Sequence, residues 1–158
     1  MSLLKVKGDL LELARQGHFD VVVHGANCQS TMNSGIAKQI KDQFPEAYYV
    51  DVDDRRKPEH KLGCYSNAYI DLYDFIIINA YTQLNYNRRD EEFKDRFEYE
   101  AFEKILRTLA KYHPNNRYGF PYIGMGLAGG DKKRILTMLE DFSTQITGTV
   151  KLVEYECN

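Results

Sequence analysis

The sequence predicts an α/β fold, a three-layer α/β/α sandwich whose central sheet is mixed and mostly parallel. Short β-branched or alternating runs, which are typical of strands, alternate along the chain with stretches whose apolar residues recur every three or four positions, which are typical of helices. One pair of strand-like runs is separated by only four residues, which indicates a hairpin. Strands that alternate with helices form parallel sheets covered on both faces, and the hairpin adds one antiparallel pair.

The first part of the chain contains two strand–helix units. Residues 4–7 alternate between apolar and charged side chains, and the apolar patch over 10–14 has helical spacing. The β-branched run Asp20–His24 predicts a buried strand, and the small, polar residues 25–35 predict a loop. Ile36, Ala37, Ile40 and Phe44 then keep the spacing of a helix up to Pro45.

The middle of the chain predicts a solvated connection followed by a hairpin. Residues 51–61 are dense in charge and include a proline, so we expect them to lie in solvent. Residues 64–70 and 75–80 are rich in β-branched and aromatic side chains. The segment 71–74 is short and acidic, which favours a tight connection between two strands.

The last part of the chain predicts two further helix–strand units. Phenylalanines 93 and 97 begin a series of apolar residues at every fourth position that ends at His113-Pro114, which predicts a long amphipathic helix. A strand follows over 118–123, then a helix over 135–142 and a final strand over 149–155. All of this fits one domain of 158 residues.

Composition excludes several classes of protein. Apolar residues make up 43% and charged residues 28% of the chain, as in globular proteins, and the net charge of −2 provides no general attraction for nucleic acid. Three scattered cysteines without C-x-x-C spacing predict neither a zinc site nor a disulfide framework. No signal peptide or membrane-length apolar stretch is present. We therefore expect a soluble, cytoplasmic monomer with no metal and no cofactor.

A glycine-rich stretch follows the strand predicted at 118–123. Gly124-Met-Gly-Leu-Ala-Gly129 matches the G-x-G-x-x-G pattern of dinucleotide-binding proteins. Only 29 residues follow Gly129, which is too few for the remaining strands of a Rossmann half-domain. The glycines still favour a phosphate ligand, because backbone N–H groups can approach an anion where no Cβ intervenes.

Three loops follow a strand and precede a helix: Gly8-Asp9, residues 25–35 and residues 124–131. In sheets of this class, ligands bind beyond the carboxyl ends of the strands. We therefore expect the three loops to converge on one elongated ligand.

These loops resemble those of the macrodomain family, and the resemblance covers nearly the whole chain. It rests on Gly8-Asp9-Leu10, His24-Gly-Ala-Asn27 with Asn33-Ser-Gly-Ile-Ala37, Phe44-Pro-Glu-Ala-Tyr48 and Pro121-Tyr-Ile-Gly-Met-Gly-Leu127. The resemblance implies a single macrodomain over residues 1–158 whose ligand is ADP-ribose or one of its phosphorylated or conjugated derivatives. Nucleic acid would enter only as a modified substrate.

The resemblance also implies a role for each loop. Asp9, with the backbone at Leu10, would bind the adenine, and Asn27 would contact the distal ribose. Tyr155, near the end of the last predicted strand, is a candidate to pack beside the adenine. The diphosphate would be wrapped by backbone N–H groups of the two glycine loops, which comprise Ser34, Gly35, Ile36, Gly124, Met125, Gly126 and Leu127.

The chain looks most similar to macrodomains that hydrolyse ADP-ribose-1″-phosphate to ADP-ribose and phosphate. It is also similar to the branch that removes ADP-ribose from glutamate or DNA bases, and a non-catalytic reader of ADP-ribose is a further alternative. The glutamate and DNA hydrolases carry a lysine shortly after the fourth strand, where this chain has Tyr81-Thr-Gln83. This difference argues against a lysine-dependent mechanism and leaves hydrolysis by another route open. The phosphatase-like variants are matched by His24 ahead of Asn27-Cys28 and by Gly126-Leu-Ala-Gly-Gly-Asp131.

Two residues are candidates for catalysis, and each has a structural alternative. Asp131 could activate water or attack phosphorus, or it could cap the helix that follows. His24 could protonate the leaving hydroxyl or bind phosphate, or it could be a hydrogen-bonded core histidine. The same holds for two binding candidates: Asp9 is also a favourable helix cap, and Asn27 is also a favourable turn residue.

Overall fold

We examined the fold in a computed structural model, which describes residues 3–32, 35–84, 97–124 and 130–156. Its strands are β1 (Leu4–Gly8), β2 (Val21–Asn27), β3 (Tyr65–Ile70), β4 (Phe75–Gln83), β5 (Arg117–Phe120) and β6 (Thr149–Tyr155). Its helices are α1 (Leu10–Arg15), α2 (Gly35–Gln43), α3 (Pro45–Asp53), α4 (Pro58–Lys61), α5 (Tyr99–Tyr112) and α6 (Lys132–Gln145).

The strands form one mixed sheet in the order β1-β6-β5-β2-β4-β3. Every neighbouring pair is parallel except β3 and β4, which form the antiparallel hairpin that the short segment 71–74 predicted. The carboxyl ends of the five parallel strands therefore meet at one edge of the sheet, which we call the carboxyl edge. The loops that follow β1, β2 and β5 all begin there.

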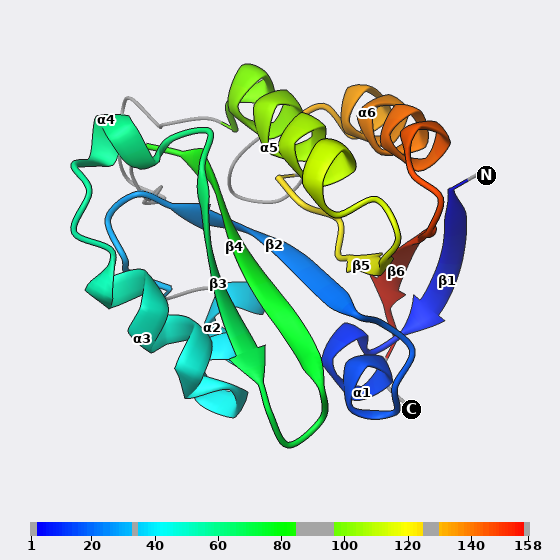
Figure 1. The fold of residues 1–158 in the computed structure, drawn as a ribbon, viewed down its shortest axis with the longest axis horizontal. Helices are drawn as coiled ribbons and strands as arrows, with labels where there is room; N and C mark the ends of the chain where they lie inside the picture. The colour runs from blue at the N-terminus through cyan, green and yellow to red at the C-terminus, as the bar shows by residue number, and fades with distance from the viewer. Residues whose placement is uncertain (1–2, 33–34, 85–96, 125–129, 157–158) are drawn as a thin grey trace.

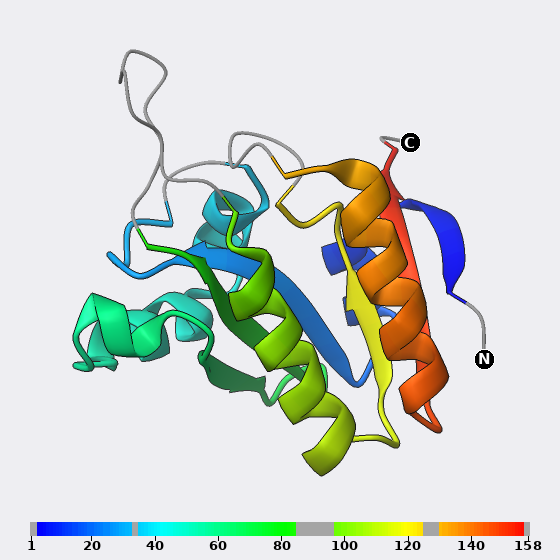
Figure 2. The same ribbon diagram turned by 90° about the horizontal axis from the view of Figure 1, so that it is seen from above.

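Helices cover both faces of the sheet, which confirms the three-layer prediction (Figures 1 and 2). α5 and α6 lie side by side on one face, and α1, α2 and α3 lie on the other. The alternation along β2 explains this arrangement: Val21 and Val23 belong to the core beneath α5 and α6, whereas Val22 belongs to the opposite core. A strand buried on both faces reads as a continuous apolar run.

The segment 51–61 is solvated as expected over residues 52–60, but it is partly helical and its two end residues are buried. Helix α3 runs to Asp53 and α4 covers 58–61, and each begins with a proline at its first position, where a missing N–H costs nothing. Asp51 and Lys61 are almost completely buried, with 0% and 2% of their surface exposed. These two residues are the exceptions in a segment that is otherwise exposed or partly exposed, and their opposite charges lie against each other.

Three boundaries also differ from the predictions. β2 continues to Asn27, so the loop after it is shorter than predicted. β5 ends at Phe120, and α5 begins at Tyr99. Residue 93, where the amphipathic pattern starts, lies outside the described residues.

Candidate functional site

The site is assembled from the turns at the carboxyl edge. The first turn, after β1, places Asp9 beside the end of the last strand. Gly8 is the register partner of Tyr155, and the Glu156 N–H donates to the Gly8 carbonyl at 2.9 Å. The Tyr155 side chain is 63% exposed. Asp9, to which the resemblance gives the adenine, and the candidate Tyr155 therefore lie at neighbouring strand ends.

Asp9 is the N-cap of α1. Its Oδ1 accepts hydrogen bonds from the N–H groups of Leu11 at 3.0 Å and Glu12 at 3.2 Å. Leu10 begins the helix, and its side chain is buried in the core, so only its backbone is available to the site. The cap holds the Asp9 carboxylate at the helix N-terminus, where the dipole favours a negative charge.

The second turn, after β2, is ordered by the side chain of Asn27. The Asn27 Oδ1 accepts from the Gln29 N–H at 2.8 Å, and its Nδ2 donates to Thr31 Oγ1 at 2.8 Å. This is the turn-forming role that the residue type allows. Cys28 beside it is buried, and burial raises the pKa of its thiol to about 11, so this cysteine is not an activated nucleophile.

This turn leads into the N-terminus of α2. Gly35, the first residue of α2, has φ of +57°, and a Cβ built on it meets nothing within 4 Å. Gly35 is exposed, and the side of its Cα where a Cβ would stand is open. Ile36 packs partly against the core beneath α2. Ser34 lies outside the described residues.

The third turn, after β5, starts at Gly124 with φ of +73°. A Cβ at Gly124 would come within 2.3 Å of the Phe97 ring, so only glycine fits here. The Gly130 N–H donates to the Gly124 carbonyl at 2.7 Å, so these two glycines lie next to each other. Met125, Gly126 and Leu127 lie outside the described residues.

Asp131 follows this turn as the N-cap of α6. Its Oδ1 accepts from the N–H groups of Lys133 at 2.9 Å and Arg134 at 3.3 Å. Its own N–H donates to the hydroxyl of Tyr99 at 2.7 Å, and the Arg134 guanidinium stacks 3.8 Å from the centre of the Tyr99 ring. The residue remains exposed. Tyr99 therefore orients Asp131 from α5, a role without any signal in the sequence.

His24 lies in the interior and not at the edge. It is completely buried on β2, and its Nε2 lies 2.6 Å from Asn79 Oδ1 on the adjacent strand. Burial is the main cause that lowers the pKa of the imidazole, which the Asn79 bond partly offsets. Its Nδ1 has no hydrogen-bond partner among the described residues. This placement agrees with the core-histidine alternative, since the ring does not reach a ligand at the edge.

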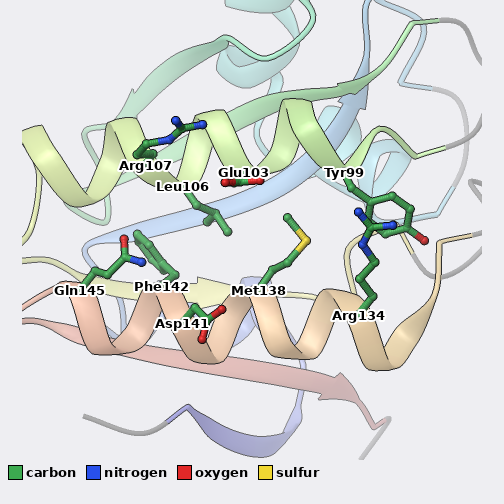
Figure 3. Close-up of a pocket in the computed structure, with 9 residues that line it drawn as sticks. All are labelled: Tyr99, Glu103, Leu106, Arg107, Arg134, Met138, Asp141, Phe142 and Gln145. Atoms are coloured by element: carbon green, nitrogen blue, oxygen red, sulfur yellow. The ribbon is translucent and has the colours of Figure 1, made fainter.

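A groove of about 370 Å³ lies elsewhere, between α5 and α6 (Figure 3). Glu103, Leu106 and Arg107 line it from α5, and Met138 and Phe142 line it from α6. It is part of the outer helical layer, and it approaches the carboxyl edge only where Tyr99 and Arg134 stack. We therefore place the candidate site at the three turns and not in this groove.

The described residues contain no group of three or more histidine, cysteine, aspartate or glutamate side chains placed to hold a metal ion. None of the helices formed by these residues has both the length and the apolar character to cross a bilayer.

Comparisons with known proteins were made for both sequence and structure. No protein-family model matches the chain. An uncharacterized 17.5 kDa protein from the tk–vs intergenic region of enterobacteria phage T4 is 28% identical over 163 residues, which cover 99% of this chain and 98% of the phage protein. This relative has no described activity to compare.

Solved structures match the fold across almost the whole chain. Thermosipho africanus DarTG in complex with ADP-ribose superposes with a TM-score of 0.76 at 19% identity, over 98% of this chain and 42% of that chain. The macrodomain of Thermus aquaticus DarG superposes with a TM-score of 0.74 at 21% identity, over 98% of both chains. A macrodomain protein from Streptomyces coelicolor superposes with a TM-score of 0.66 at 20% identity, over 99% of both chains. Together with the sheet order and the three turns, these likenesses show that the chain has the macrodomain fold.

Proposed function

We propose that this chain binds ADP-ribose along the carboxyl edge and hydrolyses ADP-ribose-1″-phosphate to ADP-ribose and phosphate. The observation that carries the binding is the convergence of three strand-to-helix turns on this edge, each of which begins a helix. The solved DarTG structure with this fold holds ADP-ribose, which supports the same ligand class here.

The order of the turns suggests how the ligand lies. Asp9 and the exposed ring of Tyr155 mark the end for the adenine. The N-terminus of α2, which begins at the exposed Gly35, would supply backbone donors for the diphosphate. Asp131 and the turn of Asn27 mark the end for the distal ribose, where a 1″-phosphate would sit.

The first turn of α6 favours a phosphomonoester at the distal-ribose end of the ligand. Three consecutive cations, Lys132 to Arg134, follow Asp131, although cations at a helix N-terminus oppose the helix dipole. A local arrangement that costs some stability is often retained for a site. Next to Asp131, these charges would attract a dianionic phosphate and stabilise the charge that develops on it during transfer.

In the proposed reaction, the Asp131 carboxylate either takes a proton from the water that attacks phosphorus or attacks phosphorus itself. The bond between phosphorus and the 1″ oxygen breaks, and that oxygen leaves as the hydroxyl of ADP-ribose, with a proton from Asp131 when it acts as the base or from solvent water when it attacks phosphorus. If Asp131 attacks, water then hydrolyses the acyl phosphate. His24 has no direct part in these steps, because its ring is buried.

The Asp131→Asn variant tests this proposal. Asparagine caps helices as well as aspartate does, so we expect the unfolding free energy to change by less than about 0.5 kcal/mol. Phosphate release from ADP-ribose-1″-phosphate should fall by about 100-fold or more, because the general base or nucleophile is lost. Calorimetry should show that ADP-ribose binding is retained. Asp131→Ala should lose activity and also about 1 kcal/mol of stability.

Assays of the wild-type protein and of Asp131→Asn distinguish the phosphatase, the hydrolase of modified substrates and the non-catalytic reader. Unchanged phosphate release by Asp131→Asn would remove Asp131 from the chemistry. A wild-type protein that releases no phosphate but removes ADP-ribose from modified protein or nucleic acid would be a hydrolase of those substrates. Calorimetric binding of ADP-ribose without turnover of any of these substrates would identify a reader.

A further inference from the structure

A buried ion pair lies beneath the turn that follows β2. Lys61, the last residue of α4, places its Nζ 3.5 Å from Oδ1 of Asp51 on α3. The two side chains are 2% and 0% exposed. Removing two charges from water is expensive, so a buried pair is weak evidence for stability by itself. Its position in the fold needs another explanation.

The pair holds Ser30, which lies in the turn. The Ser30 hydroxyl is within 3.1 Å of the Asp51 carbonyl and 3.2 Å of the Asp51 Oδ1, either of which can accept its proton. The Lys61 ammonium donates to the Ser30 Oγ at 3.2 Å. One hydroxyl therefore connects the turn to both α3 and α4.

The backbone of this turn adopts conformations that need such a restraint. Ser30 has φ of +57° and Met32 has φ of +41°, in the left-handed region that side-chain-bearing residues rarely adopt. Residues in this region persist only where their surroundings hold them there. The Met32 side chain is buried in the core, and Asn27 bonds Gln29 and Thr31 at the other end of the turn.

The restraint is itself attached to the sheet. The Tyr81 hydroxyl, on β4, donates to Asp51 Oδ1 at 2.7 Å, and the Lys61 ammonium lies 4.5 Å from the centre of the Tyr81 ring. Ser30 is thus fixed relative to the carboxyl edge through α3, α4 and β4 together. Asp51 Oδ2 has no hydrogen-bond partner among the described residues, so Oδ1 carries all of these contacts.

We propose that Lys61 is a positioning residue: with Asp51 it fixes Ser30, and through Ser30 it holds residues 27–32 in the shape that contacts the distal ribose of ADP-ribose. Neither member of the pair touches the ligand. This inference rests on the proposed function for its ligand, whereas the restraint of the turn can be tested without any ligand.

Ser30→Ala is the sharpest test, because it removes the connecting hydroxyl and leaves the ion pair in place. We expect the amides of residues 28–32 to exchange their hydrogens at least about 10-fold faster in the ligand-free protein. The dissociation constant for ADP-ribose, measured by calorimetry, should rise by about 10-fold. The double variant Lys61→Met/Asp51→Leu removes the pair without leaving a buried charge and should show both effects.

Ser143→Ala is the matched control. Its hydroxyl also donates to a backbone carbonyl, that of Glu140 at 2.6 Å. Ser143 is buried whereas Ser30 is half-buried, and it lies towards the end of α6 remote from Asp131. This control should leave both exchange in 28–32 and affinity unchanged. Equal loss of affinity in the control would attribute the effect to general destabilisation and overturn the proposal.

Two other results would also overturn it: unchanged exchange in Ser30→Ala, or faster exchange with unchanged affinity. Failure of the wild-type protein to bind ADP-ribose would instead defeat the proposed function and, with it, the ligand named here. The exchange measurements would still decide whether the pair restrains the turn.

Discussion

The buried ion pair makes a quantitative prediction about stability. Lys61→Met keeps an unbranched side chain, one atom shorter, but leaves the Asp51 carboxylate without its cation. Breaking a buried pair in this way costs about 3–5 kcal/mol. The Asp51 Oδ1 would keep its bonds from Tyr81 and Ser30, so we expect the low end of this range, about 3 kcal/mol. In a chain of this size such a loss lowers the melting temperature by roughly 6–12 °C.

Urea denaturation measures this effect through the midpoint and the slope of the transition. Lys38→Met is the matched control, because Lys38 pairs with Asp42 at 2.9 Å on the surface, where the two side chains are 60% and 57% exposed. It should cost less than about 0.5 kcal/mol. Adding Asp51→Leu to Lys61→Met should recover most of the stability, since no buried charge remains. A Lys61→Met protein within about 0.5 kcal/mol of wild type would refute the argument that the pair is desolvated.

Two further predictions concern pH and packing. Burial lowers the pKa of His24 in the folded protein, so folding favours the neutral ring. The contribution of His24 to the unfolding free energy is therefore complete above the unfolded-state pKa near 6.5 and declines as the pH falls below it. Relative to His24→Leu, the wild-type unfolding free energy should fall by up to about 1.4 kcal/mol per pH unit below pH 6.5 in urea titrations, and parallel pH profiles would contradict the burial of the ring. Gly148→Ala should lower the unfolding free energy, measured by calorimetric melting, by about 1–3 kcal/mol, because a Cβ there would come within 1.8 Å of the Asn116 carbonyl oxygen. An unchanged melting temperature would show that this turn is not tightly packed.

The regular elements followed from the sequence because their signals are local. The strand predicted over 149–155 has the same bounds in the structure, and the hairpin at 71–74 is where the short acidic connection indicated it. Alternation and helical spacing reflect which side of an element meets the core, so they can be read without knowing the neighbours. α3 was not predicted, because its apolar and polar residues do not follow a clear helical face.

The candidate site was predicted as a set of loops, and only the structure supplied its side-chain arrangement. Asp9 and Asp131 precede helices in the sequence, and both are caps in the structure. Tyr99 orients Asp131 across 32 positions of the chain, and no local pattern reveals a contact between residues so far apart.

The sequence by itself indicated all six strands and the helices α1, α2, α5 and α6, and with them the three turns that begin at the carboxyl edge. Tertiary structure decided which polar residues face solvent. It buried Asp51 and Lys61 at the ends of a segment whose charge had indicated a solvated connection. It also buried His24 completely on β2, beside the neighbouring strand β4. The physical reason is that burial of a charged or polar group depends on a partner, and the partners of these residues come from other elements of the fold.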